Sequence, residues 1–112
     1  MLAQVTPSEL PAWCAAAPAG SLPVVLDVRE AWEVATANVS DARFELLCIP
    51  MGQLMARMDE IPKDRPIACL CHHGVRSRQV ALYLLQQGYA HTVNIAGGID
   101  SWSSIDSSVP RY

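Results

Sequence analysis

The chain has 112 residues, of which 51% are hydrophobic and 17% charged, and its formal net charge is −3. This length and composition are typical of one globular domain with a single core, and they exclude a disordered chain. The negative charge argues against a surface for nucleic acid or for an anionic membrane. The sequence also lacks an apolar run of the roughly 20 residues that a membrane-spanning helix needs.

The first residues, Met1–Leu10, have neither a basic start nor a long apolar stretch, so they lack the pattern of an export signal. We therefore expect a cytoplasmic protein. In that compartment Cys14, Cys48, Cys69 and Cys71 suit free thiols better than structural disulfides.

The first half of the chain contains a predicted helix, a strand and a loop. Residues 6–9 form a capping-box pattern with proline directly after the threonine, which predicts a helix start, and proline and glycine at 18–20 end that helix. The almost continuous apolar run 24–28 predicts a buried parallel strand. Residues 30–35 predict a short helical turn, and 36–47 show no clear period, so we expect a loop there.

The second half alternates between strands and helices. Brief strands are predicted at 48–50, 67–70 and 92–95, and helices at 52–61, 77–87 and 98–105. The helix from Ser77 has the clearest apolar stripe, and Gly88 lies just beyond its end.

Alternating strands and helices predict an α/β fold, with one central parallel sheet and helices on both faces. We expect a single domain over residues 1–112, with a loose tail over 105–112. Sites in such sheets form beyond the carboxyl ends of the strands, and residues 71–76 follow one of these ends.

A thiol lies in this position. Cys71 ends a strand, the next helix is predicted from Ser77, and Gly74 can adopt the backbone angles of a sharp turn. Backbone N–H groups in such a turn converge on one point and bind negative charge, and the start of the helix and Arg76 strengthen this effect. We therefore expect the Cys71 thiol to be largely ionised near neutral pH and to act as the nucleophile.

The proposed anion-binding loop consists of His72, His73, Gly74, Val75, Arg76 and Ser77. The two histidine side chains either steer an anionic donor and assist a proton step, or point to solvent while only their N–H groups matter. Cys69, inside the strand, is interpreted as a core residue. We expect no metal site, because Cys69, Cys71 and the two adjacent histidines rarely converge on one ion in so tight a loop.

Asp27 and Arg29 flank the end of the first strand and are supporting residues of the candidate site. They either line its mouth or form a hydrogen-bonded pair that holds neighbouring loops together, and the pair is the interpretation we favour. Glu33 is expected to belong to the same polar network.

Three stretches resemble, in the same order, the signatures of rhodanese-like domains: LDVREAWE (26–33), CHHGVRS (71–77) and AGGIDSW (96–102). The resemblance covers nearly the whole chain and implies the rhodanese-like fold and a single-domain sulfurtransferase. We expect no metal or organic cofactor, because the loop itself supplies the electrostatics. In this family-based prediction, Cys71 takes a sulfane sulfur from a donor such as thiosulfate, becomes a persulfide, and passes the sulfur to cyanide or a thiol. Partners would be these small molecules and a sulfur-relay protein.

Two alternatives stay open beside this resemblance. Cysteine-dependent phosphatases and arsenate reductases are less favoured, because such phosphatases carry one more residue between cysteine and arginine and usually a histidine where this chain has Leu70. A non-catalytic binding or sulfur-carrier module is the other alternative. The stretch 35–52 also departs from the family pattern, because its usual histidine and glycine are missing.

Overall fold

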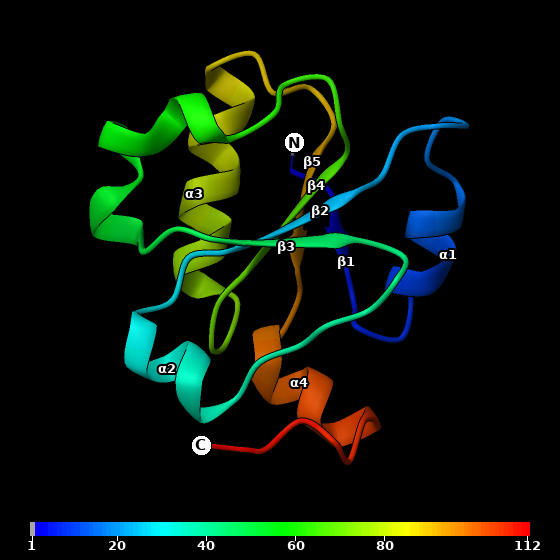
Figure 1. The fold of residues 1–112 in the computed structure, drawn as a ribbon, viewed down its shortest axis with the longest axis vertical. Coiled ribbons are helices and arrows are strands. Elements are labelled where there is room, and N and C mark those ends of the chain that lie inside the picture. Colours follow the sequence, from blue (N-terminus) through cyan, green and yellow to red (C-terminus); the bar gives the residue numbers. More distant parts are fainter. Residues whose placement is uncertain (1) are drawn as a thin grey trace.

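The structure is a computed structural model that describes residues 2–112, so position 1 of the expected domain lies outside it. Its centre is a sheet of five parallel strands in the order β1-β5-β4-β2-β3 (Figure 1). The strands are β1 (Gln4–Val5), β2 (Val24–Asp27), β3 (Glu45–Cys48), β4 (Ile67–Leu70) and β5 (Thr92–Ile95). Because β4 is the central strand, its carboxyl end lies in the middle of the edge where sites form in parallel sheets.

Helices cover both faces of the sheet, which confirms the α/β prediction. The helices are α1 (Leu10–Ala15), α2 (Ala31–Thr36), α3 (Val75–Gln86) and α4 (Gly98–Ile105), with two 3-10 helices, η1 (Met51–Gln53) and η2 (Met55–Glu60). The helices α1 and α4 share one core cluster, and α3 belongs to the other, with the 3-10 segments packed against it. Figure 1 shows α1 and α3 on opposite sides of the strands.

Several boundaries differ from the predicted ones. The strand β1 was not predicted, because two residues at the edge of a sheet carry no periodic signal. Residues 45–48 form β3 where a loop and the start of a brief strand were expected; this edge strand is partly exposed, so its sequence is not uniformly apolar. The predicted helix 52–61 is broken into 3-10 turns, with a non-helical Arg57 at φ −120° and ψ 19°. The helix α3 begins two residues before Ser77.

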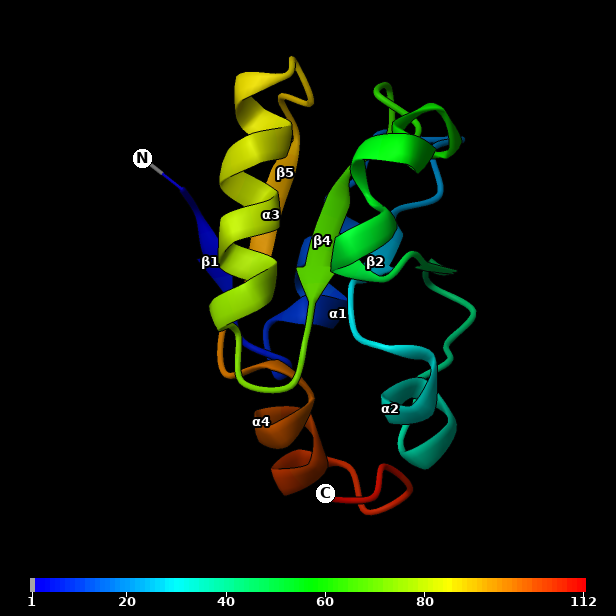
Figure 2. The same cartoon turned by 90° about the vertical axis from the view of Figure 1, so that its left-hand side faces the viewer.

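The last residues also differ from the expectation of a loose tail. Ile105 is the final residue of α4, and beyond it the Val109 side chain is 5% exposed and packs into the core cluster of α1 and α4. Tyr112 forms hydrogen bonds with Arg29 and Glu33. Figure 2 shows α2, α4 and the end of the chain gathered around the carboxyl end of β4. The tail is therefore docked beside the candidate site.

None of the helices described between residues 2 and 112 combines the length and the apolar character needed to cross a lipid bilayer.

Candidate active site

Cys71 lies directly after the central strand β4, as predicted. The turn that follows is short, because α3 begins at Val75. Gly74 closes the turn with a φ of 96°, in the left-handed region that favours glycine. A Cβ at this position would also lie only 3.1 Å from the backbone nitrogen of Gly97. The turn therefore brings the start of α3 close to the Cys71 side chain.

The sulfur of Cys71 receives hydrogen bonds from the backbone. The N–H groups of Gly74 and Ser77 donate to Cys71 Sγ over 3.1 and 3.3 Å. Both groups belong to the start of α3, where free N–H groups and the helix dipole favour negative charge. Cys71 is only 1% exposed, so these bonds act in surroundings from which bulk water is largely excluded. The geometry is suited to holding a charged sulfur.

The start of α4 holds the loop in this orientation. The N–H groups of Ile99 and Asp100 donate to the carbonyl oxygens of Cys71 and His72 over 2.9 and 3.0 Å. Gly98 permits this approach, because its φ is 60° and a Cβ there would lie 2.6 Å from the His72 oxygen. With these carbonyl groups turned toward α4, the following N–H groups are free to face the sulfur. The glycine pair of the third signature stretch therefore supports the loop that follows Cys71.

Asn94 of β5 is a further residue of the site that the sequence analysis did not single out. It is 1% exposed, and its Oδ1 accepts a hydrogen bond of 2.5 Å from Ser77 Oγ. Its Nδ2 donates to the carbonyl oxygen of Gly74 and to Gln4 Oε1, both over 3.1 Å. An amide in the middle of a buried strand is a recognisable signal, since buried polar groups need partners. Asn94 thus fixes the turn from the sheet side.

Arg76 is paired with Glu33 of α2. Its Nη1 and Nη2 donate to the two carboxylate oxygens over 2.7 and 2.8 Å, and the Glu33 side chain is 5% exposed. The hydrogen bonds from Arg76 lower the pKa of Glu33 from 4.5 to about 2, against the opposing effect of burial. The pair is therefore ionic at neutral pH. The positive charge that the sequence analysis assigned to the loop is present, but a carboxylate partly compensates it.

Asp27 and Arg29 form the expected hydrogen-bonded pair. Arg29 Nε and Nη2 donate to the Asp27 carboxylate over 2.9 and 2.7 Å, and both side chains are 0% exposed. Arg29 Nη1 donates to the carbonyl oxygen of Glu33 and to the Tyr112 hydroxyl, over 3.2 and 3.0 Å. The pair therefore reaches the loop through Glu33 and Tyr112, and it holds neighbouring segments together.

The two histidines of the loop have different surroundings. The side chain of His73 is 61% exposed, and Val75 is 66% exposed, so at these two positions the backbone is the part that faces the turn. His72 is half-buried, its ring stacks on His73 and on Tyr112 with centroids 4.0 Å apart in each case, and its buried Nε2 has no hydrogen-bond partner. The expectation that both histidine side chains point to solvent therefore holds for His73 and is wrong for His72, whose ring is packed between His73 and Tyr112.

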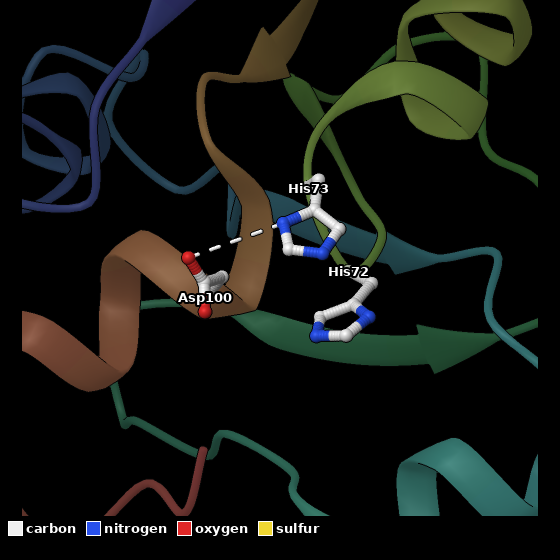
Figure 3. A group of neighbouring side chains, drawn as sticks. All are labelled: His72, His73 and Asp100. Carbon is white, nitrogen blue, oxygen red and sulfur yellow. Dashed lines mark ion pairs between the residues drawn. The ribbon is translucent and has the colours of Figure 1, made fainter. Parts of the chain in front are cut away.

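His72, His73 and Asp100 bring metal-binding atoms within 4.8 Å of one another on the rim of the loop (Figure 3). His73 Nδ1 lies 3.9 Å from Asp100 Oδ2. A metal ion lies in the plane of each imidazole that binds it, whereas these two rings are stacked with an angle of only 26°. In this arrangement they cannot both direct a nitrogen at one ion. The prediction of no metal site stays a prediction.

The other cysteines differ from Cys71 in their surroundings. Cys69 is 0% exposed, and burial raises the pKa of its thiol well above the usual range, which agrees with the interpretation as a core residue. Cys48 is an exposed residue at the end of β3, but its sulfur is partly shielded from water, and this desolvation raises the pKa of its thiol as well. Neither environment favours a thiolate.

Comparison with known proteins gives the family. The sequence model of one protein family, described as the rhodanese-like domain, matches residues 10–105 of this chain. The chain belongs to the rhodanese-like domain family. It is 41% identical over 80 residues to a protein named sulfurtransferase from Allochromatium vinosum, and the aligned region covers 71% of each chain. It is 33% identical over 76 residues to the thiosulfate sulfurtransferase GlpE of Actinobacillus pleuropneumoniae, which covers 68% of this chain and 67% of that protein.

Solved structures of rhodanese-like proteins have the same fold. A rhodanese-related protein from Thermoplasma volcanium is 27% identical, covers 98% of this chain and 99% of its own, and has a TM-score of 0.76. The predicted family and fold are therefore confirmed, and the named relatives support a transferase.

Proposed function

We propose that this rhodanese-like protein is a sulfurtransferase that carries sulfane sulfur as a persulfide on Cys71. The observation that carries the proposal is the pair of N–H groups, from Gly74 and Ser77, that donate to Cys71 Sγ at the start of α3. A thiolate is the nucleophile in sulfur transfer, and this arrangement stabilises it.

With thiosulfate as donor, the Cys71 thiolate attacks the outer sulfur. A bond forms between the two sulfurs, the bond between the outer sulfur and the sulfonate sulfur breaks, and sulfite leaves with the electron pair. The loop N–H groups stabilise the negative charge of the resulting persulfide. Cyanide or an acceptor thiolate then attacks the terminal sulfur, and the Cys71 thiolate is regenerated.

Arg76 supports the binding of an anionic donor in this proposal. The carboxylate of Glu33 engages Nη1 and Nη2, but a guanidinium carries five N–H groups, so others are available to a sulfonate. The Glu33 charge reduces the attraction for anions, so thiosulfate binding is expected to be modest. We further propose a cytoplasmic location. A sulfur-relay protein as physiological partner is what the family resemblance implies.

The direct test is mass spectrometry of the reduced protein after incubation with thiosulfate. A mass increase of one sulfur atom on Cys71 is expected, together with thiocyanate formation when cyanide is added. Cys71→Ser should lose both signals, while Cys48→Ser, which removes an exposed thiol outside the loop, should retain them. An unmodified Cys71 in protein shown to have a free thiol would contradict the proposal.

A sulfur-carrier or binding module is the second candidate, and the enclosure of Cys71 favours it, since the residue is only 1% exposed. In that case a persulfide forms from a protein or low-molecular-weight persulfide donor, while turnover of thiosulfate stays negligible. The phosphatase alternative is tested by hydrolysis of p-nitrophenyl phosphate, which we expect to be absent because four residues separate Cys71 from Arg76.

A further inference from the structure

The last residue of the sequence lies against the active loop. The Tyr112 ring stacks on His72, with centroids 4.0 Å apart and an angle of 8° between the planes. The Tyr112 hydroxyl donates to Glu33 Oε2 over 2.9 Å and accepts a hydrogen bond from Arg29 Nη1 over 3.0 Å. One side chain therefore joins the tail to the loop, to α2 and to the end of β2.

These contacts reach the loop at two points. One is His72, the residue after the nucleophile, whose ring is held between Tyr112 and His73. The other is Arg76, which pairs with the same Glu33 carboxylate that accepts the Tyr112 hydroxyl. Tyr112 thus acts on both ends of the turn that surrounds the sulfur without touching the reacting atoms itself.

A folded segment places Tyr112 in this position. Val109 is buried in the core, and Arg111 Nη2 donates to the Asp100 carbonyl oxygen over 3.3 Å. Burial raises the pKa of Tyr112 above 10.0. The hydroxyl therefore keeps its proton at neutral pH and can donate it to the Glu33 carboxylate while it accepts from Arg29.

We propose that Tyr112 is a positioning residue for sulfur transfer, which keeps Arg76 and His72 in the orientation that makes the loop attractive to anions. The Tyr112 hydroxyl donates a hydrogen bond to the Glu33 carboxylate and so partly neutralises it, which leaves more of the Arg76 positive charge to attract anions. The Tyr112 ring holds the His72 ring in place by stacking on it. This inference rests on the proposed function for its kinetic consequence. Its electrostatic consequence, an excess affinity of Cys71 for anionic reagents, is independent of that function.

The test compares Tyr112→Phe, which keeps the ring and loses the hydroxyl, with Tyr112→Leu, which loses both. Tyr83→Leu is the matched control, because Tyr83 is likewise half-buried but lies in the second half of α3, beyond the turn that surrounds the sulfur. For each protein, the rate of Cys71 alkylation is measured with the anion iodoacetate and with neutral iodoacetamide. The ratio of the two rates reports the local potential and cancels changes in access and in thiol ionisation that affect both reagents equally.

We expect the ratio to fall several-fold in Tyr112→Phe and about tenfold in Tyr112→Leu, and to stay unchanged in the control. The kcat/KM for thiosulfate should fall in the same order, with Tyr112→Phe between the wild type and Tyr112→Leu. If Tyr112→Leu does not fold, the Phe variant carries the test, because it preserves the stacked ring.

Unchanged ratios in both variants would overturn the inference, because a purely structural tail affects stability alone. An equal increase in the rates of Cys71 alkylation by both reagents would also overturn the inference, since it would mean that the tail only shields the thiol from solvent. A wild-type protein that forms no persulfide refutes the proposed function, while the reagent ratio still decides the role of Tyr112.

Discussion

Replacing Glu33 by glutamine removes the negative charge that faces Arg76 and preserves most of the local geometry. A glutamine oxygen can still accept the hydrogen bond of 3.0 Å that the Glu30 N–H donates to Glu33 Oε1. The main loss is the ion pair, in which both Arg76–Glu33 hydrogen bonds are shorter than 2.9 Å and the carboxylate is 5% exposed. The variant therefore tests the charge of the Glu33 carboxylate, whose strongest partner is Arg76 and which also accepts the Tyr112 hydroxyl.

The magnitude follows from the pKa of Glu33, which falls from 4.5 to about 2 on folding. At about 1.4 kcal/mol for each pH unit, this difference corresponds to about 3 kcal/mol of stability. Because the folded-state pKa is depressed, the contribution is fully present above pH 4.5 and is lost as the pH falls toward 2. Protonated Glu33 then resembles glutamine, so the wild type and Glu33→Gln should converge in acid.

The assay is urea unfolding followed by tryptophan fluorescence, at several pH values between 7 and 3. We expect Glu33→Gln to be about 3 kcal/mol less stable than the wild type at pH 7, with a difference that shrinks steadily below pH 4.5. Glu60→Gln is the matched control, because Glu60 pairs with Arg57 over 2.8 and 2.9 Å but its side chain is 43% exposed. It should change stability far less. A difference for Glu33→Gln that stays constant across this pH range would refute the reasoning.

Three other predictions concern the loop and its thiols. Gly98→Ala should lower the free energy of unfolding by at least about 2 kcal/mol and slow persulfide formation, because the new Cβ would lie 2.6 Å from the His72 oxygen. Gly20→Ala is the control for backbone strain alone, because Gly20 has a similar positive φ and nothing within 4 Å of its Cβ position. Equal losses of stability in the two variants would contradict the clash at Gly98. Asn94→Ala should cost about 1–3 kcal/mol in urea unfolding, because it leaves buried partners unpaired, and a neutral effect would argue against its role. Cys69 should stay unmodified under conditions in which iodoacetamide labels Cys71, as peptide mapping would reveal, because burial raises the pKa of the Cys69 thiol.

The sequence by itself determined the alternation of strands and helices from residue 67 onward and the position of the thiol. The strands 67–70 and 92–95 and the helix 98–105 were predicted with the bounds that the structure has, because apolar runs, helical periods and glycine turns are local signals. The loop at Cys71 was predicted for the same reason, since a strand, a glycine and a helix start are adjacent in the chain.

Only the tertiary structure decided how the loop is held. Arg76 meets Glu33 across 43 positions of the sequence, Ser77 meets Asn94 across 17, and Arg29 meets Tyr112 across 83. Side chains that pair over such separations leave no period in the sequence, and a tail of polar residues looks loose until its contacts are known. The sheet brings these segments together at the carboxyl ends of its strands, and there the charge of the loop is balanced.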